Sequence, residues 1–408
     1  MPQLTTSYSA IILGAGAAGL ACAGATQNME NILILDHGQK MACKVDIAGG
    51  GKANFTNKNM GIEHFHTANP QFCRSALSRF TPDDCLEWLN THKIQYEERE
   101  HGQFFCTRSA KDFSRLLREG CSKSTVKLET TIRHVSYTDE TFFIETSSGH
   151  YSAPNLVIAL GSAAFPQTGA TSLGLHLAQQ LGHKTIPFRP ALAGFILPNW
   201  NNETMAGMSL PVRLHVQKIK DAYPIQNFPA TLSLLFTHKG ISGPAALQAS
   251  LLWEKNTPIT IDFLPDNNLE NELLLPAYGK LLLKNTLKQF FPERFCQWIL
   301  TEFNIPNTRT AELSKKHRQT LVQTIHAYTV TPTAIEDLPR AEVAKGGVVT
   351  DDVSSKTFES KLCKGLYFCG EVLDVTGRLG GYNLHWALAS GKAVGMALSQ
   401  KMQKDANK

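Results

Sequence analysis

The feature that most constrains this chain is an apolar run that meets a glycine-rich turn near the N-terminus. Residues 10–13 (AIIL) lead directly into 14–19 (GAGAAG), a stretch compatible with a helix follows, and a second apolar run at 32–35 ends in Asp36. A strand, a glycine turn, a helix, a second strand and a terminal acid, in that order, are typical of the βαβ unit that binds a dinucleotide. The chain is therefore expected to contain a Rossmann-like domain.

Each of the three glycines and the acid in such a unit has a physical task. Gly14 permits the tight turn, Gly16 lets the backbone approach a pyrophosphate, and Gly19 lets helix and strand pack closely. The phosphates then lie at the helix N-terminus, where free N–H groups and the helix dipole favour negative charge. Asp36 is placed to accept hydrogen bonds from a ribose, which disfavours the 2′-phosphate of NADP but does not separate NAD from FAD.

A second nucleotide-type segment lies near the C-terminus. Residues 365–371 (GLYFCGE) have the pattern of a short buried strand that ends in Gly-Glu, and 380–383 (GGYN) open a last helix. The N-terminus of that helix can point at the carbonyl edge of a flavin, which carries negative charge when the flavin is reduced. We therefore expect the two chain ends to fold into one cradle for FAD, although a plain helix start after a turn is the alternative for this segment.

Composition narrows the class of protein. The chain has 408 residues, enough for two or three domains, and its 42% apolar and 18% charged residues fit a soluble globular protein. A net charge of +5 permits an anionic substrate or an RNA partner without indicating one. The nine cysteines are scattered and form no CxxC, which argues against a disulfide framework, a zinc site or a dithiol relay and favours a cytoplasmic protein. No apolar run is long enough to cross a bilayer, and no clustered ligand set suggests a metal.

The pattern along the chain predicts an α/β protein with a discontinuous Rossmann-like FAD-binding domain and inserted β-barrel-like and helical domains. Helices are expected at 71–80, from Pro82, at 109–120 and at 172–181, strands at 126–137, 141–146 and 156–160, and a frayed tail at 401–408. The expected domains are 1–190 (first part of the FAD-binding domain), 191–265 plus 329–340 (antiparallel β), 266–328 (helical) and 341–408 (second part of the FAD-binding domain).

Six stretches carry a family resemblance that covers nearly the whole length. They are GAGAAG at 14–19, DIAGGGKANFTN at 46–57, ALGSAAFPQTGATSLGLHLAQQLGH at 159–183, FTHKGISGPAALQAS at 236–250, AEVAKGGV at 341–348 and GLYFCGEVLDVTGRLGGYNLHWALASG at 365–391. With these stretches the chain resembles the YhiN/BaiN-like flavoproteins, also described as aminoacetone-oxidase-family FAD-binding or NAD(P)/FAD-dependent oxidoreductases.

The resemblance implies a set of FAD contacts. The pyrophosphate would meet Gly14, Ala15, Gly16, Ala17, Ala18 and Gly19, the ribose would meet Asp36, and the adenine would meet the backbone of Val135. The isoalloxazine would lie near Gly50, Gly51, Lys52 and Asn54, the third loop would contribute Ala159 and Gly161, and the far side of the cofactor would meet Gly370, Glu371, Gly381, Tyr382, Asn383 and Leu384.

The chain also departs from the family pattern. The third loop, usually ATGG, contains Leu160 and Ser162 around Gly161, and the triple-glycine loop, which commonly continues Arg-Cys-Asn, continues Lys52-Ala53-Asn54. The missing Cys removes a potential thiol beside the flavin, so a mechanism that requires it is in doubt here.

Two side chains near the expected flavin edge are candidates for catalysis. Arg378 could bind a substrate carboxylate, phosphate or carbonyl, and His385 could give or take a proton near neutral pH. The alternatives are a surface arginine and a histidine packed in the core. His238 is more simply a solvated loop residue, and the run 315–318 (KKHR), which could touch RNA, is more simply one wet helix face.

Three functions are compatible with these observations. The first is an FAD-dependent oxidoreductase that exchanges hydride with a small organic substrate lodged between the FAD domain and the insertion, by C=C reduction or by amine or alcohol oxidation. The second is a flavin-dependent reductase of an RNA base, uracil to dihydrouracil, and the third is a flavin-bearing binding protein without turnover. No second glycine fingerprint follows, so NAD(P)H is expected at most as a transient electron donor, and the sequence predicts no oligomeric state.

Overall fold

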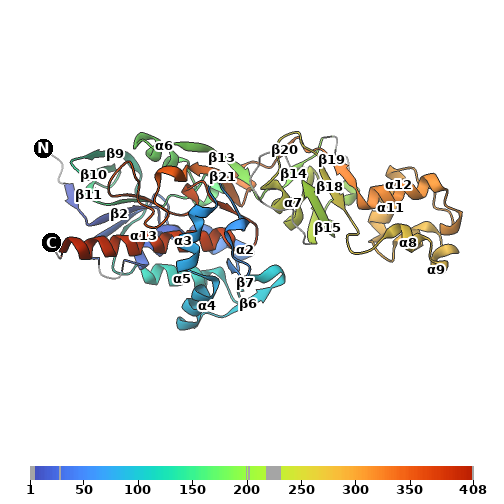
Figure 1. The fold of residues 1–408 in the computed structure, drawn as a ribbon, viewed down its shortest axis with the longest axis horizontal. Helices are drawn as coiled ribbons and strands as arrows, with labels where there is room; N and C mark the ends of the chain where they lie inside the picture. Colours follow the sequence, from blue (N-terminus) through green and yellow to red (C-terminus); the bar gives the residue numbers. More distant parts are fainter. Residues whose placement is uncertain (1–4, 27–28, 199, 201–202, 217–230, 407–408) are drawn as a thin grey trace. The chain divides into compact units, whose positions relative to one another are not determined.

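The computed structural model describes residues 5–26, 29–198, 200, 203–216 and 231–406. The chain divides into two compact units, Met1–Pro190 with Leu338–Lys408, and Ala191–Asp337 (Figure 1). The chain thus leaves the first unit at Pro190 and re-enters it at Leu338, close to the positions 190 and 341 at which the sequence pattern changes.

The first unit is built on a parallel sheet to which both chain ends contribute. Its strand order is β22-β12-β2-β3-β8, and every neighbouring pair is parallel. The strands are β2 (Ala10–Leu13), β3 (Ile32–Leu35), β8 (Thr125–Lys127), β12 (Leu156–Ile158) and β22 (Leu366–Phe368). Four of the five are fully buried, which explains their uninterrupted apolar sequences. The predicted Rossmann-like α/β domain is therefore confirmed.

Smaller sheets surround this core. A four-stranded sheet has the order β1-β11-β10-β9, a three-stranded sheet has the order β4-β7-β6, and two pairs are β23-β5 and β13-β21. Their strands are β1 (Thr5–Ser7), β4 (Asn54–Asn57), β5 (Phe65–His66), β6 (Tyr96–Arg99), β7 (Gln103–Cys106), β9 (Ile132–Thr138), β10 (Thr141–Thr146), β11 (His150–Ala153), β13 (Thr185–Ala191), β21 (Val343–Val348) and β23 (Thr376–Gly377).

The single strand expected at 126–137 is in fact two strands in different sheets. The chain turns between β8 and β9 at Glu129, whose φ is +50°, and the Thr130 N–H donates to the carbonyl of Asp36 at 2.9 Å. Periodicity alone does not reveal this break because both halves are rich in strand-forming residues.

Two helices of the first unit begin at the caps that the sequence predicts. Thr81 caps α4 (Pro82–Thr91) with a capping box to Asp84, and Ser109 caps α5 (Ala110–Gly120). The other helices are α1 (Ala17–Gly24), α2 (Cys43–Gly51), α3 (Gln71–Arg79), α6 (Leu173–Gln180) and α13 (Tyr382–Ala406).

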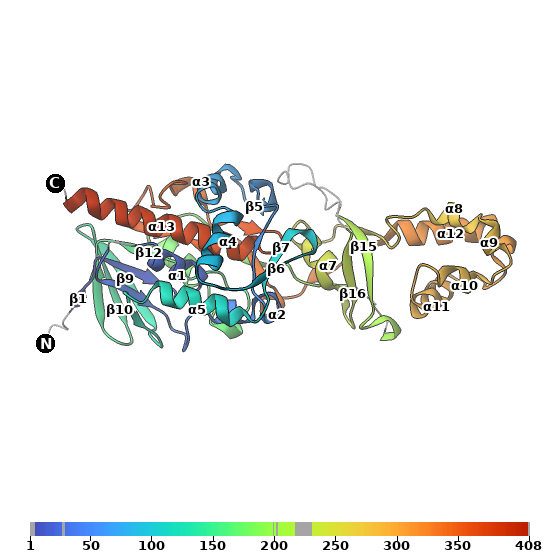
Figure 2. The ribbon, with the colours of Figure 1, turned by 90° about the horizontal axis from the view of Figure 1, so that it is seen from below.

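Helices from opposite ends of the chain pack against each other. Helix α13 lies along α1 (Figure 2), and a Cβ at Gly391 or Gly395 would overlap the backbone carbonyl oxygen of Ala18 or Cys22. Glycines four residues apart therefore let the two helix backbones approach closely. This contact fixes the C-terminal helix beside the glycine turn that follows β2.

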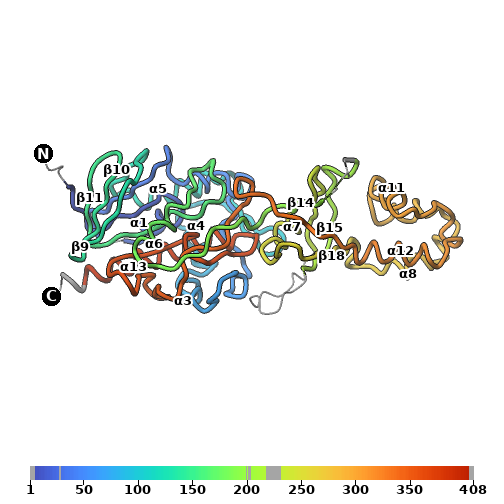
Figure 3. The backbone as a smooth tube through the Cα atoms, turned by 90° about the horizontal axis from the view of Figure 1, so that it is seen from above, coloured from blue at the N-terminus to red at the C-terminus, as the bar shows by residue number. Residues whose placement is uncertain are grey.

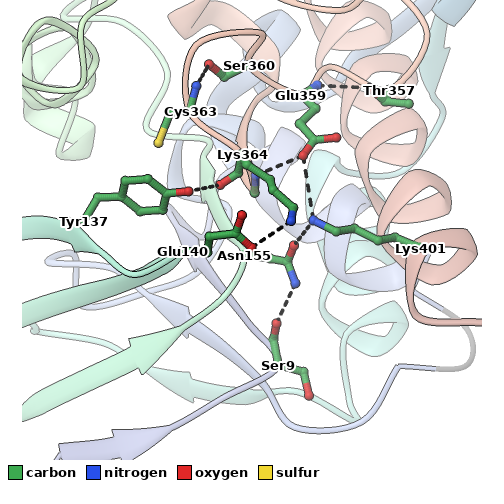
Figure 4. Close-up of polar contacts among 11 residues, drawn as sticks. Ser9, Tyr137, Glu140, Asn155, Thr357, Glu359, Ser360, Cys363, Lys364 and Lys401 are labelled. Carbon is green, nitrogen blue, oxygen red and sulfur yellow. Dashed lines mark hydrogen bonds and ion pairs between the residues drawn. The ribbon is translucent and has the colours of Figure 1, made fainter. Parts of the chain in front are cut away.

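The tail expected to fray from 401 is helical as far as Ala406, and 407 and 408 lie outside the described residues. Helix α13 continues to Ala406, and Lys401 Nζ lies 3.0 Å from Asn155 Oδ1 and 3.7 Å from Glu359 Oε1. Asn155 in turn donates to the Ser9 carbonyl at 3.0 Å (Figure 4). The polar side chain of Lys401 thus ties the last helix to the amino end of the parallel sheet, and β1 and the end of α13 lie at the same end of the unit (Figure 3).

Replacing Asn155 by Ala should destabilise the first unit. The side chain is 3% exposed, and its loss leaves the Ser9 carbonyl and the Lys401 ammonium without this partner. We expect the free energy of unfolding to fall by about 1–3 kcal/mol in chemical denaturation. Lys364→Met is the control: it removes an exposed ion pair with Glu140 at 2.7 Å, so it should cost less than about 1 kcal/mol. Equal effects of the two changes would contradict the role of Asn155.

The second unit is an antiparallel sheet with a set of helices at one end of it (Figures 1 and 2). The strand order is β19-β18-β15-β16-β17-β14-β20, and a buried aromatic core includes Phe236, Phe263, Phe295 and Trp298. The strands are β14 (Phe195–Ile196), β15 (Ser209–Val216), β16 (Leu232–Phe236), β17 (Gly240–Ser242), β18 (Ile259–Asp262), β19 (Tyr328–Val330) and β20 (Ala334–Ile335). The helices are α7 (Gly243–Ser250), α8 (Leu269–Leu273), α9 (Pro276–Gly279), α10 (Leu283–Leu287), α11 (Glu293–Glu302) and α12 (Lys315–His326).

Within the described part of the chain, helices that combine the length and the hydropathy needed to traverse a bilayer do not occur.

Candidate FAD site

Two glycines of the first turn are required by packing within the protein. Gly14 has a φ of +107°, and a Cβ there would lie 2.5 Å from the Ala159 carbonyl oxygen. A Cβ at Gly19 would overlap the Gly14 carbonyl oxygen. These two positions bring the turn after β2, the start of α1 and the loop after β12 together.

Four other glycines border open space instead. A Cβ at Gly16, Gly50, Gly51 or Gly161 would meet no atom of the protein within 4 Å. At Gly16 the backbone angles (φ −83°, ψ −172°) are accessible to any residue, so neither strain nor protein packing demands glycine there. The residues present therefore fit a dinucleotide, because glycine leaves room for a group as bulky as a pyrophosphate.

Asp36 holds the glycine turn as well as facing the expected ribose position. Its Oδ2 accepts from the Ala15 N–H and its Oδ1 accepts from the Gly38 N–H, both at 2.7 Å. The carboxylate is 20% exposed, and each oxygen keeps acceptor capacity for a ribose hydroxyl. Asp36 thus couples the end of β3 to the phosphate-binding turn.

Val135 lies further along the chain than the segment that reaches Asp36. Its side chain is fully buried in β9, and its carbonyl accepts from the Gln180 side-chain amide at 2.6 Å. The backbone that contacts the Asp36 region is that of Glu129 and Thr130, through bonds to the Gly38 and Asp36 carbonyls. The contact of the Val135 backbone with an adenine therefore stays a prediction.

The triple-glycine loop is an unwound helix end. In the last part of α2, Ala48 is extended (ψ 144°) and Gly49, Gly50 and Gly51 have φ of 57°, 65° and 80°. Lys52 Nζ points away from this loop and donates to the carbonyls of Thr107 and Arg108 at 2.6 and 3.0 Å. The Lys52 side chain is therefore engaged within the protein, and its backbone N–H and carbonyl bond to Gly49 and Cys106 as well.

Ala53 occupies the position at which the resembling family commonly has Cys. Its side chain is fully buried, its φ is +49°, and its N–H donates to the Ala48 carbonyl at 2.8 Å. Position 53 thus faces the core and carries no thiol, so this residue offers no proton donor.

The C-terminal loop packs directly on the segment after the glycines. A Cβ at Gly381 would overlap the Thr56 carbonyl oxygen, and Asn54 lies beside it with its amide 2.7 Å from Gln103 Oε1. Asn383 brackets Gly377, accepting from its N–H at 2.8 Å and donating to its carbonyl at 2.9 Å. The His385 N–H donates to the Gly381 carbonyl and so makes the first helical hydrogen bond of α13. The N–H groups of Tyr382, Asn383 and Leu384, which precede it, therefore have no acceptor within the helix. These are the donors that a flavin carbonyl edge requires.

Gly370 and Glu371 connect the end of β22 to neighbouring elements. The Gly370 N–H donates to Ser390 Oγ at 2.9 Å, and the Glu371 carboxylate accepts from Lys44 Nζ at 3.1 Å and from the Ala344 N–H at 3.0 Å. The Glu371 side chain is therefore committed to holding α2 and β21 together, and only its backbone remains for a cofactor.

His385, expected as a candidate acid or base, is a core residue. It is 0% exposed, its Nε2 lies 2.9 Å from the Phe80 carbonyl, and its Nδ1 lies 2.8 Å from Thr56 Oγ1. Because the carbonyl can only accept, Nε2 carries the proton and Nδ1 accepts from the threonine. Burial lowers the pKa of His385 to about 4. A neutral ring with both nitrogens engaged has no free position for proton transfer to a substrate, so we do not assign it that role.

The buried His385 predicts a loss of stability in mild acid. The folded pKa of about 4 lies below the ordinary value of 6.5, so the unfolded chain binds the proton more readily between these pH values. Stability that is complete above pH 6.5 should fall by about 2 kcal/mol by pH 5 because of this one group. Denaturation of the wild type and His385→Gln at pH 7.5 and pH 5 measures it: the variant, which cannot titrate, should lose correspondingly less.

An exposed histidine, changed in His134→Gln, is the control and should keep the full wild-type slope. A His385→Gln variant that loses as much stability in acid as the wild type would contradict the assignment.

Arg378 lies in the loop between β23 and α13, beside the expected flavin edge. Its N–H donates to the His64 carbonyl at 3.0 Å, and its own carbonyl accepts from Asn383 Nδ2 at 3.3 Å. The side chain is half-buried, and this burial lowers the pKa of the guanidinium. A guanidinium taken partly out of water is suited to bind an anionic or developing-anionic oxygen.

Sequence reasoning missed the residues that surround Arg378. Glu63 and His64 end the short 3₁₀ turn η1 (Ile62–His64) and face this loop, but no spacing rule links them to position 378. His238 is exposed, as expected for a loop histidine. Among the described residues, no three His, Cys, Asp or Glu side chains are grouped as a metal site would need.

Comparison with known families identifies the group to which the chain belongs. Residues 8–397 match the family model described as the HI0933-like protein Rossmann domain. This chain belongs to the HI0933-like family of FAD-dependent oxidoreductases. The predicted flavoprotein family is thus confirmed, and the glycine turns and the α13 N-terminus of this HI0933-like protein are the parts that would hold FAD.

Relatives of this HI0933-like protein carry two different names. A protein of Haemophilus influenzae and one of Escherichia coli, both named ribosomal RNA dihydrouridine synthase, are 37% and 36% identical to it, each over 96% of this chain and 98% of the relative. A protein of Clostridium scindens named 3-dehydro-bile acid delta(4,6)-reductase is 28% identical over 96% of this chain and 98% of the relative. The names share one reaction type, the reduction of a C=C bond.

Proposed function

We propose that this protein reduces the C=C bond of a uracil base in ribosomal RNA, giving dihydrouridine, with FAD as its cofactor. The observation that carries the proposal is the pair of full-length relatives with that name at 37% and 36% identity. They match this chain more closely than the bile-acid reductase does, so the RNA base ranks above a small organic substrate.

Reduction of this C=C bond requires a group that stabilises negative charge on the carbonyl oxygen, and Arg378 can supply it. The C=C bond of uracil is conjugated to a carbonyl, so when hydride adds at the far carbon, negative charge develops on the carbonyl oxygen. FAD, when bound and reduced, supplies that hydride. A partly buried guanidinium at this oxygen stabilises the charge more in the transition state than in the ground state. Arg378 is the residue to which we assign this task.

The glycine turns keep the cofactor in place and the helix start of α13 tunes it. The N–H groups at the start of α13, those of Tyr382, Asn383 and Leu384, favour negative charge at a flavin carbonyl edge, which eases reduction of the cofactor. We propose NADH or NADPH as the electron donor. It would bind only transiently, because the sequence has no second dinucleotide fingerprint.

The test compares acceptors for the reduced protein. The purified protein is reduced anaerobically with NADH or NADPH and mixed with ribosomal RNA from a strain that lacks its gene, and reoxidation of the flavin is followed together with dihydrouridine by mass spectrometry. We expect reoxidation well above the buffer control and dihydrouridine at one or a few positions. RNA that neither reoxidises the flavin nor gains dihydrouridine would overturn the proposal.

A small enone is the second candidate, favoured by the Clostridium scindens relative. A 3-keto-4-ene steroid serves as the parallel acceptor in the same experiment. Reoxidation by the steroid and not by RNA would establish C=C reduction of a small molecule instead. The salt dependence of RNA binding gives a further criterion, because affinity for a phosphate backbone falls steeply as salt rises.

A further inference from the structure

Four polar side chains from two distant segments meet at the start of α13. We call Glu63, His64, Arg378 and Tyr382 the acid–base cluster. The rings of His64 and Tyr382 have centroids 5.0 Å apart, His64 Nε2 lies 3.5 Å from Glu63 Oε1, and the His64 carbonyl accepts from the Arg378 N–H at 3.0 Å. The cluster thus brings a phenol, an imidazole, a carboxylate and a guanidinium to the loop that leads into the expected flavin edge.

Exposure increases stepwise across the cluster. Tyr382 is 6% exposed, the His64 side chain 19% and the Glu63 side chain 65%. A proton taken up at the Glu63 side can therefore reach His64 without crossing apolar core. Tyr382 is the innermost member and is sealed on its other side by Phe65, whose ring centroid lies 6.1 Å away.

Two polar atoms in the cluster are poorly satisfied. His64 Nδ1 is buried without a well-formed hydrogen bond among the described residues, although the Asn59 backbone lies close enough to act on the pKa of the ring. The Tyr382 hydroxyl donates to the Asn59 carbonyl at 3.3 Å, a long O–H···O bond. Buried polar atoms are normally paired, and unpaired ones are found where a ligand or a catalytic step uses them.

Burial keeps the phenol and the imidazole of the cluster neutral beside the Arg378 cation. Burial raises the pKa of Tyr382 to about 12, while the nearby Arg378 acts in the opposite direction. Burial, and then the positive charge of Arg378, lower the pKa of His64. At neutral pH the tyrosine therefore keeps its proton, and Arg378 stabilises the phenolate that remains once the proton has left.

We propose that Tyr382 is the proton donor of the reduction and that His64 is the positioning residue that returns the proton from water. The inference rests on the proposed function, and it fills the role that a thiol at position 53 cannot fill in this chain. Hydride that bound, reduced FAD would supply to the far carbon of the C=C would form the first C–H bond and leave negative charge on the carbonyl oxygen, which Arg378 holds. The Tyr382 O–H bond then breaks, the proton forms the second C–H bond at the carbon next to the carbonyl, and His64 reprotonates the phenolate.

A binding test examines the cluster without turnover. In the FAD-loaded protein, 4-nitrophenolate mimics the charged intermediate and is followed by its absorbance. We expect Tyr382→Phe to weaken its binding about 10-fold, as for the loss of one hydrogen bond to a charged group, with FAD retained. The control is Tyr137→Phe, which removes a hydroxyl that donates to the Lys364 carbonyl at 3.0 Å, and it should bind like the wild type. Unchanged affinity in Tyr382→Phe, or no binding by the wild type, would overturn the inference.

Turnover measurements separate this inference from the proposed function. If the wild type reduces a C=C acceptor, Tyr382→Phe should leave flavin reduction by the donor unchanged and slow substrate reduction about 100-fold or more. His64→Ala should slow turnover at unchanged FAD content, and added imidazole should restore it. Full substrate reduction by Tyr382→Phe would overturn the inference even though the proposed function stands. A wild type that binds 4-nitrophenolate through Tyr382 but reduces no C=C acceptor would leave the site supported and the proposed reaction refuted.

Discussion

A valine at position 16 should abolish FAD binding and leave the fold intact. Gly16 has ordinary backbone angles, and a Cβ there would meet no protein atom within 4 Å. The added methyls would occupy the space through which we expect the pyrophosphate to pass, at the N-terminus of α1. We expect FAD affinity to fall by at least about 100-fold, a loss of roughly 2.7 kcal/mol of binding free energy. Fluorescence titration of the apoprotein with FAD measures it, and the midpoint of apoprotein unfolding should stay at the wild-type value.

Two further glycine variants make this result interpretable. A Cβ in Gly120→Ala would come no closer to a neighbour than 3.9 Å, to the Gly24 Cα, so both FAD binding and stability should be kept. A Cβ in Gly19→Ala would overlap the Gly14 carbonyl, so that variant should lose stability, by about 1–3 kcal/mol for an overpacked site. Stoichiometric FAD in Gly16→Val would show that the phosphates bind elsewhere.

The second large effect, a loss of substrate reduction, is expected when Arg378 is replaced. Arg378→Met keeps much of the apolar stem of the side chain but removes the guanidinium that we assign to the substrate carbonyl. We expect kcat/KM for the C=C acceptor to fall about 100- to 1000-fold, as for loss of one group that stabilises developing negative charge. The rate of flavin reduction by the nicotinamide should change little, and FAD content should be unaffected. Stopped-flow measurement of the two half-reactions distinguishes these effects.

A charge-conserving variant sharpens the test of Arg378. Arg378→Lys keeps the positive charge and loses the forked donor geometry, so it should retain part of the activity that Arg378→Met loses. Substrate reduction by Arg378→Met within about threefold of the wild type, well inside the loss expected for such a group, would remove Arg378 from the mechanism.

The sequence predicted those parts of the fold in which local pattern and tertiary role coincide. The apolar runs at β2, β3, β12 and β22 are buried on both faces, so their hydrophobicity is visible without knowledge of their neighbours. The capping box at Thr81 and the cap at Ser109 are likewise local signals, and both helices begin as expected.

The candidate site was harder to predict because its contacts join residues far apart in the chain. His385 follows the GGYN segment and so lies near the expected flavin edge in sequence, yet its ring is held by Thr56 and Phe80, which no local pattern connects to it. The turn at Glu129 and Thr130 brings the chain to Asp36 earlier than Val135, a shift that strand-forming residues on both sides conceal.

The close packing of α13 on α1 also has a signal in the sequence, although the sequence analysis did not predict it. Gly391 and Gly395 are four residues apart and admit the backbone of α1, so the spacing of small residues would have indicated the contact between the two chain ends. The cluster around His64 and Tyr382, by contrast, depends on a tertiary contact that no spacing rule describes.

The most direct test of the account is the absorption spectrum and FAD stoichiometry of the purified protein. The two chain ends share one parallel sheet and are joined by the contact of α1 with α13. Together they should hold one FAD per chain. The purified protein should therefore be yellow and release FAD on denaturation. A protein that is colourless as purified should become yellow on incubation with excess FAD. A preparation that remains colourless after that incubation and gel filtration would contradict the central claim.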